Sequence, residues 1–235
     1  MEINFFRYPL VFLMIVFALP SISQSNNLSK TRSAFLLGMF NDYLGKQFVP
    51  NHPTESQFVT SFYASESSVT TVFLDSLKLF SGGDSSKIVL KKEGVENPIL
   101  KIYSEKYSKY FNTYYNFKKS EGFGYFDDRD SINRGDFEIY IGKLNSKKIK
   151  GNNEKLSYLA GSFLRNGKMN NDGAYKFQFG NSISKYKIVR KFLMDTKSRI
   201  LFKKVKKDRI PVISVIEFVP SKALKQVLER LPPCP

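Results

Sequence analysis

Three residue types that carry much of protein chemistry are almost missing from this chain. Its 235 residues include one cysteine, one histidine and no tryptophan. A single cysteine, Cys234, excludes a disulfide within the chain, and with one histidine it excludes zinc sites that need several Cys or His ligands. We expect Cys234, which stands in a proline-rich tail, to be an exposed and idle thiol. No cofactor and no metal ion is expected.

Histidine-dependent catalysis would have to use one residue. A Ser-His-Asp triad needs a histidine base, and His52 lies between Pro50 and Pro53 in a predicted loop. The chain also lacks a nucleophile motif of the G-x-S-x-G type. His52 is therefore interpreted as a surface loop residue.

Long hydrophobic runs are also absent, apart from one near the N-terminus. Residues 10–19 are apolar, and this run is well short of the roughly 20 residues that span a bilayer. Arg7 precedes the run, and Ser21 and Ser23 follow it at the spacing of a signal-peptidase site. We predict a signal peptide over residues 1–23 and cleavage before Gln24. The mature chain is expected to lack a transmembrane segment and to be periplasmic or extracellular.

The charge is unevenly distributed along the chain. Residues 24–142 contain 14 Lys plus Arg and 14 Asp plus Glu, whereas residues 143–235 contain 22 basic and 6 acidic residues. The excess of 22 − 6 = 16 positive charges therefore lies in the second part. We divide the chain into the signal peptide, a charge-neutral part over 24–142 and a basic part over 143–235, with one continuous domain over 24–235 as the alternative.

Such asymmetry indicates an anionic partner. The possible polyanions are an anionic glycan, a lipid surface or nucleic acid bound without sequence specificity. A lysine-rich surface that only keeps the protein soluble is the alternative. The candidate anion-binding residues are Lys187, Arg190, Lys191, Lys203, Lys204, Lys206, Lys207 and Arg209.

The basic part shows a clear pattern of elements. Apolar residues three or four positions apart predict a helix over 183–194, with Ser182 as its N-cap. β-Branched and aromatic residues predict two strands of a hairpin over 199–206 and 210–219. Pro220 ends the second strand, and Ser221 is placed to cap a final helix. Upstream, we predict a helix over 154–166 and a strand over 175–179.

The neutral part is expected to be rich in helices. Apolar spacing predicts helices over 31–46, 69–80 and 98–117. The sequence from Thr54 to Gln57 has the form of a capping box, which predicts a helix continuing through Tyr63. A strand is predicted over 136–141. The fold class is therefore α+β: a helix-rich N-terminal part followed by a small antiparallel sheet with flanking helices.

One short pattern occurs twice. Residues 35–40 and 158–163 share the order aromatic-Leu-x-Gly-x-Phe, and both fall on predicted helices. A glycine within a helix permits close packing. A single match of six residues does not establish a duplication.

The acidic residues form one cluster, which comprises Asp127, Asp128, Asp130, Asp136 and Glu138. Paired carboxylates can hydrolyse glycosidic bonds, and calcium loops also use carboxylates, although the spacing fits no such loop. A solvated loop is the alternative. From these features we expect an exported, non-catalytic binding module whose basic surface meets an anionic partner. The second hypothesis is a secreted hydrolase that uses the carboxylates between Asp127 and Glu138.

Overall fold

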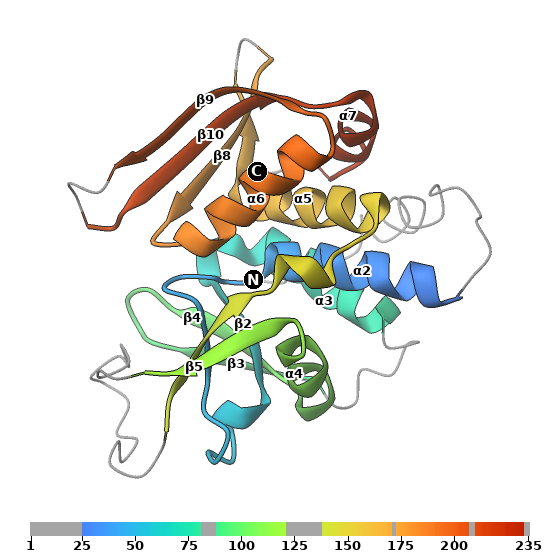
Figure 1. The fold of residues 1–235 in the computed structure, drawn as a ribbon. Coiled ribbons are helices and arrows are strands. Elements are labelled where there is room, and N and C mark those ends of the chain that lie inside the picture. Colours follow the sequence, from blue (N-terminus) through green and yellow to red (C-terminus); the bar gives the residue numbers. More distant parts are fainter. Residues whose placement is uncertain (1–24, 81–87, 121–137, 171–172, 207–209, 233–235) are drawn as a thin grey trace, which may run out of the picture.

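The structure, a computed structural model, describes residues 25–80, 88–120, 138–170, 173–206 and 210–232 (Figure 1). The expected signal peptide lies outside these ranges, so the predicted cleavage before Gln24 and the predicted periplasmic or extracellular location stay predictions. Also outside them are Asp127, Asp128, Asp130, Asp136, Lys207, Arg209 and Cys234. Within the described ranges, no helix has the length and apolar character needed to cross a membrane.

The helices and strands follow the same order twice, α-β-β-α-β-β-α. The first repeat comprises α2 (Ser25–Met39), β1 (Lys46–Phe48), β2 (Phe58–Tyr63), α3 (Ser67–Phe80), β3 (Val89–Glu93), β4 (Ile99–Tyr103) and α4 (Glu105–Asn112). The second comprises α5 (Asn152–Asn166), β7 (Gly167–Met169), β8 (Tyr175–Gly180), α6 (Ile183–Asp195), β9 (Arg199–Lys206), β10 (Ile213–Val219) and α7 (Lys222–Leu228). Strands β5 (Tyr115–Lys119) and β6 (Tyr140–Leu144) join the repeats, and short 3-10 turns occur at Glu55–Gln57, Ala64–Glu66 and Ser146–Lys148.

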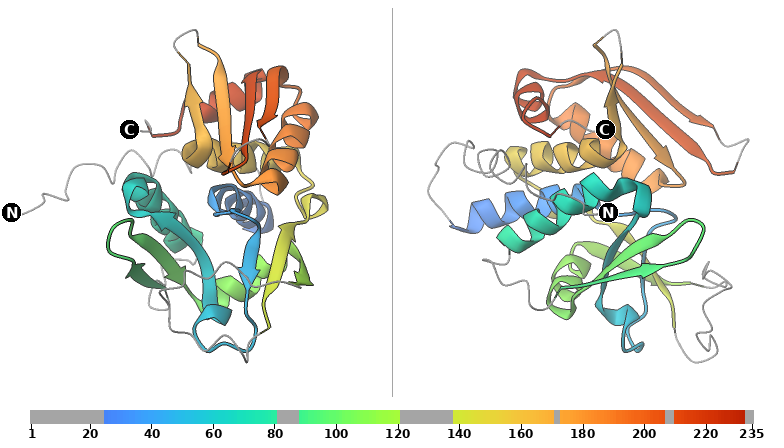
Figure 2. Two further views of the ribbon diagram at one scale, coloured as in Figure 1. Left: turned by 90° about the vertical axis from the view of Figure 1, so that its left-hand side faces the viewer. Right: turned by 180° about the vertical axis from the view of Figure 1, so that it is seen from behind.

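Corresponding strands of the two repeats form sheets with the same strand order. The second repeat forms an antiparallel sheet in the order β7-β8-β10-β9, and the first forms β2-β4-β3, the same order for the corresponding strands. Strand β1, the counterpart of β7, pairs instead with β6 in a third sheet, β1-β6-β5. The second-repeat sheet lies at one end of the molecule and the other two sheets lie at the opposite end, with helices between them (Figures 1 and 2).

The core is continuous through both repeats, and its centre is the contact between α2 and α5. A methyl group added at Gly38 would overlap the carbonyl oxygen of Tyr158, and one at Gly161 would overlap that of Phe35. Only glycine permits this approach of two helix backbones. These glycines occupy the same place in the pattern shared by residues 35–40 and 158–163, so the short match marks the axis that relates the two repeats.

The predicted α+β class is confirmed, and most predicted elements of the basic part are present. Helices occur at Asn152–Asn166 and Ile183–Asp195, and the hairpin consists of β9 and β10. The Ser221 side chain accepts a hydrogen bond from the backbone N–H of Leu224, as expected of an N-cap. Ser182 is the N-cap residue of α6, but its side chain makes no capping hydrogen bond.

The neutral part is less helical than predicted. The predicted helix over 98–117 is wrong, because residues 99–103 form β4, residues 105–112 form α4, and residues 115–119 form β5. The helix expected after Thr54 is also wrong, since only a short turn precedes strand β2. In both cases pairing between distant strands buries aromatic and β-branched residues, such as Phe62 and Ile102, and overrides the local spacing.

Helix α2 also ends earlier than predicted. It stops at Met39, and Leu44 and Gly45 adopt positive φ angles of 59° and 99°. The chain therefore turns sharply before β1. This turn brings Phe40, Asn41 and Asp42 beside the second repeat, where they line a pocket.

Candidate functional site

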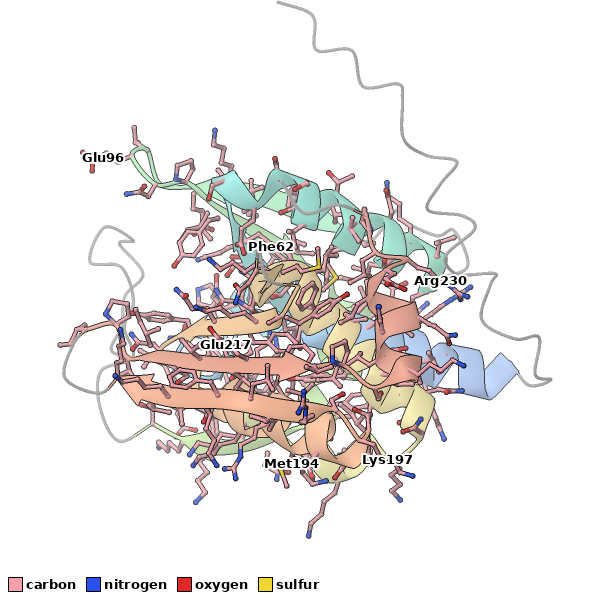
Figure 3. All side chains as sticks on the ribbon, turned by 90° about the horizontal axis from the view of Figure 1, so that it is seen from above. Phe62, Glu96, Met194, Lys197, Glu217 and Arg230 are labelled. Carbon is pink, nitrogen blue, oxygen red and sulfur yellow. The ribbon has the colours of Figure 1, made fainter. Side chains whose placement is uncertain are left out.

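One face of the second-repeat sheet is strongly basic. In an antiparallel pair, residues directly opposite each other point to the same side. Phe177 lies opposite Ile216, and both are fully buried, so this side of the sheet faces the helices. Lys176 lies opposite Glu217, so these two residues belong to the other side, which is directed toward the solvent. Figure 3 looks onto this sheet and labels Glu217.

The strand register then identifies the other residues on this side. Lys168 lies opposite Lys176, Lys204 opposite Val215, Lys206 opposite Ile213, and Arg199 opposite Val219. We call this set the basic sheet face: Lys168, Lys176, Arg199, Lys204 and Lys206.

Most charges of the basic sheet face have no counter-charge within the part of the chain that the structure describes. Lys176 forms an ion pair with Glu217 at 3.5 Å. Lys168, Arg199, Lys204 and Lys206 form no ion pair with any residue that the structure describes. Four uncompensated cations on one sheet produce a positive field that attracts a polyanion.

The candidate anion-binding residues predicted from the sequence lie in different places in the structure. Lys204 and Lys206 lie on the basic sheet face. Lys203 lies opposite Ile216 on the helix side, where it lines a shallow pocket of about 350 Å³ together with Arg190 and Met194.

The remaining predicted cations that are described belong to α6. Lys187 is exposed on this helix, and Lys191 pairs with Asp195 at 2.6 Å. Three members of the basic sheet face, Lys168, Lys176 and Arg199, were absent from the predicted set. Alternation along the predicted strands was the signal that could have identified Lys176 and Arg199.

A second candidate lies where the two central helices end. A pocket of about 230 Å³ opens here, which we call the cross-repeat pocket. It is lined from the first repeat by Phe40, Asn41, Asp42, Tyr43, Tyr63 and Glu66, and from the second by Arg165, Asn166, Gly180, Ser182, Lys185 and Pro211. The turn after α2 and the end of α5 therefore meet at one site.

A bidentate ion pair connects the repeats on one side of this pocket. Arg165 donates from Nε to Oε1 of Glu66 and from Nη2 to Oε2, both at 2.8 Å. Its third nitrogen, Nη1, donates to the carbonyl oxygen of Met39 at 2.8 Å, and the guanidinium stacks over the Phe62 ring at 4.4 Å. Bidentate pairs of this kind are among the strongest charge-assisted hydrogen bonds.

Asp42 makes the corresponding connection on the other side. Its Oδ2 accepts hydrogen bonds from Ser184 Oγ and from the backbone N–H of Lys185, at the start of α6. A carboxylate is favourable at this position because the N-terminus of a helix carries partial positive charge. The other oxygen, Oδ1, is buried without a hydrogen-bond partner, and burial raises the pKa of Asp42.

The amine of Lys185 lies in the same network. Its Nζ donates to the carbonyl oxygen of Phe40 at 2.9 Å, and the side chain is almost completely buried. Burial, together with the positive charge of Arg165, lowers the pKa of Lys185 to about 7. Every polar contact of Arg165, Asp42 and Lys185 named so far joins one repeat to the other.

Of the predicted acidic cluster, only Glu138 lies within the described residues. Glu138 is exposed, pairs with Lys119 at 2.5 Å, and accepts a hydrogen bond from Tyr140 at 2.8 Å. His52 accepts hydrogen bonds at Nδ1 from the backbone N–H groups of Thr54 and Glu55, so it stabilises a turn. Nowhere in the described ranges do three His, Cys, Asp or Glu side chains gather closely enough to hold a metal ion.

The fold matches solved structures of a homing endonuclease. Neither a protein-family model nor a curated protein sequence matches the chain. Mesophilic variants of the homing endonuclease I-DmoI align with a TM-score of 0.52 and 12% identity, over 86% of this chain and 95% of theirs. An I-DmoI variant bound to nicked target DNA in the presence of Mn aligns with a TM-score of 0.53 and 15% identity, over 86% and 97%. I-DmoI bound to DNA and Ca aligns with a TM-score of 0.51 and 13% identity, over 88% of this chain and 94% of its own.

This likeness corrects the function predicted from the sequence. The expected function, a secreted binding module, is overturned, because the chain has the fold of a homing endonuclease that was solved in complex with DNA. The predicted location stays a prediction. The second hypothesis, a secreted hydrolase using carboxylates between Asp127 and Glu138, is set aside with it. Both hypotheses were built on the N-terminal segment and on composition, neither of which specifies a fold.

Proposed function

We propose that this protein binds double-stranded DNA through the basic sheet face. The observation that carries the proposal is a set of four cations that form no ion pair with a described residue: Lys168, Arg199, Lys204 and Lys206. The shared fold adds support, because I-DmoI is solved with DNA. Among the polyanions that the charge asymmetry allows, DNA is therefore favoured over a glycan or a lipid surface.

Binding is driven mainly by phosphate neutralisation. Each lysine or arginine that contacts a phosphate releases condensed counterions from the duplex, so the affinity falls steeply as salt is added. Glu217, the one acidic residue that the described strands place on the same side, is already paired with Lys176. It therefore contributes little repulsion to the incoming phosphates.

Sequence selectivity is expected to be low. Of the four unpaired cations on the basic sheet face, only Arg199 is an arginine. Lysine binds phosphate as a point charge, whereas arginine is the better bidentate reader of guanine. Contacts to phosphates position a protein on DNA without reading its sequence.

The direct test measures duplex binding across a salt series. Fluorescence anisotropy with a duplex of arbitrary sequence gives the affinity and the slope of its logarithm against that of the salt concentration. Changing all four unpaired cations to Gln should lower that slope by up to about four units, since each phosphate contact contributes about one. The matched control removes four exposed lysines from elsewhere: Lys106, Lys147, Lys150 and Lys222.

The two variants carry the same net charge, so they separate a local site from a general attraction. If DNA binding is lost equally in both, or in neither, the basic sheet face is not the interface. Heparin and vesicles of anionic lipid serve as competitors in the same assay. A wild-type protein that prefers either of them to DNA at equal charge would contradict the proposal.

A further inference from the structure

The cross-repeat pocket is a candidate site for a divalent cation. It lies at the ends of the two central helices, and the I-DmoI complexes were solved with Mn or Ca. Nucleases often use paired metal ions, which hold the attacking and leaving oxygens of a phosphate. Such ions need several free oxygen ligands, chiefly carboxylates.

The residues that line this pocket do not fit such an ion. Its two carboxylates are Asp42 and Glu66. Both oxygens of Glu66 accept hydrogen bonds from Arg165, and one oxygen of Asp42 is held by Ser184 and the backbone of Lys185. Of these carboxylate oxygens only Oδ1 of Asp42 is free, and the amide oxygen Oδ1 of Asn166, which also lines the pocket, has no hydrogen-bond partner either.

Positive charge also opposes a metal ion here. Arg165 and Lys185 both line the pocket, and both are nearly inaccessible to solvent. In a poorly solvated site, repulsion between like charges is strong because water screens it little. The pocket therefore offers a divalent cation one free carboxylate oxygen and one free amide oxygen, beside the guanidinium of Arg165 and the amine of Lys185.

The repeat explains what these residues do instead. Asp42 follows Gly38 by four positions, and Arg165 follows Gly161 by four, so the two residues are counterparts. Asp42 holds the start of α6 in the second repeat. Arg165 holds Glu66, immediately before α3, in the first repeat. Equivalent positions thus make equivalent connections with opposite charge.

We infer that the cross-repeat pocket is a pair of clamps between the repeats and not a metal centre, and that the protein binds duplex DNA without cutting it by a metal-dependent reaction. The statement about DNA rests on the proposed function. The statement about the clamps does not.

The first experiment measures thermal unfolding with EDTA and with Mn²⁺. An ion that binds the folded state raises the melting temperature by mass action, so we expect a shift below about 1 °C for the wild type. Glu66→Gln should lower the melting temperature by roughly 6 °C or more, because it leaves Arg165 buried without its charge partner. The control, Asp75→Asn, removes an exposed carboxylate and should change little.

The isosteric variant Asp42→Asn covers the case in which Glu66→Gln does not fold. A melting temperature that Mn²⁺ raises in the wild type but not in Asp42→Asn would overturn the inference. Unchanged melting of Glu66→Gln and Asp42→Asn in EDTA would overturn the clamp, since neither side chain would then hold the repeats together.

The second experiment uses supercoiled plasmid with the full-length protein. We expect binding in EDTA that Mg²⁺ or Mn²⁺ does not strengthen, and no nicked or linear product above that of buffer alone. Metal-dependent nicking by the wild type would overturn the inference while leaving DNA binding intact. Failure to bind DNA in any buffer would instead refute the proposed function, and the melting experiment would still decide between a clamp and a metal centre.

Discussion

The two repeats present sheets of the same strand order but different surfaces. On the solvent side of β2-β4-β3, Lys101 pairs with Glu93 at 2.6 Å, and the Lys91 amine lies 5.2 Å from the centre of the Tyr103 ring. The described cations on the solvent side of this sheet are thus engaged locally. On the basic sheet face, only Lys176 has an ion-pair partner among the described residues.

This difference shows that the fold does not require the charge. Both sheets bury the same kind of residue against the helices, such as Ile102 in β4 and Phe218 in β10, each fully inaccessible to solvent. Folding therefore constrains one side of each sheet and leaves the other side free to vary. Because the positive surface appears on only one of two equivalent sheets, the fold does not require it, and this difference supports the DNA interface proposed for the second repeat.

The contact between the repeats should be the most sensitive part of the molecule. Gly161→Val places a branched side chain against the Phe35 carbonyl oxygen, and we expect a loss above about 5 kcal/mol in the free energy of unfolding. The matched control is Gly180→Ala, where nothing lies within 4 Å of an added methyl group. Denaturant unfolding checks both variants, and a folded Gly161→Val protein of normal stability would show that α2 and α5 do not pack as described.

The central strands should respond alike in the two repeats. Phe218→Ala is expected to cost about 3–5 kcal/mol, and its first-repeat counterpart Ile102→Ala about 2–5 kcal/mol, because both remove fully buried side chains. Urea unfolding measures both values. A loss well below 1 kcal/mol for one of them would mean that this sheet is not covered, and the comparison between equivalent sheets would fail.

A buried amine distinguishes β1 from its counterpart β7. Lys46 in β1 is 3% exposed, and burial lowers its pKa to about 7, while Lys168 in β7 is exposed. Between pH 7 and 10 the unfolded chain therefore binds a proton that the folded chain does not, and the free energy of unfolding rises with pH. Lys46→Met should reduce this rise by up to about 1.4 kcal/mol per pH unit.

The control for this variant is Lys168→Met, which removes an exposed amine from the counterpart strand. Equilibrium unfolding at several pH values provides the comparison. An identical pH dependence in Lys46→Met and wild type would show that the Lys46 amine keeps its ordinary pKa in the folded protein.

Single substitutions on the two sheets give the smallest expected effect. Lys204→Gln should weaken binding to duplex DNA by about 1 kcal/mol, or several-fold, at low salt, because it removes one phosphate contact. Lys91→Gln, on the corresponding sheet, should leave the affinity unchanged, since Lys91 is engaged with Tyr103. Equal losses in the two variants would indicate that DNA contacts both sheets alike.

Local patterns predicted the second repeat better than the first. Helix α6 and the β9-β10 hairpin follow their apolar spacing closely, because each also packs against its neighbours in sequence. Residues 98–117 carry a tyrosine spacing typical of one helix, yet β4 pairs with β2 some 40 positions earlier. Spacing within a segment contains no information about such a distant partner.

The cross-repeat pocket was beyond prediction for the same reason. Asp42 meets Ser184 and Lys185 across 142 and 143 positions of sequence, and Arg165 meets Glu66 across 99. No sequence pattern near Asp42 predicts these contacts. The short pattern around Gly38 and Gly161 was visible, and the structure shows that it marks the axis of the repeat.

The contact of helix backbones at Gly38 and Gly161 has a mechanical consequence. Side chains can slide or change rotamer, but two backbones in contact leave no compressible layer between them. The angle between the two sheets is therefore set by the chain itself and resists adjustment on binding. The protein therefore has little freedom to adapt to a bound duplex. Any deformation needed for a close fit on the basic sheet face would fall on the DNA, so flexible sequences would bind with the least penalty.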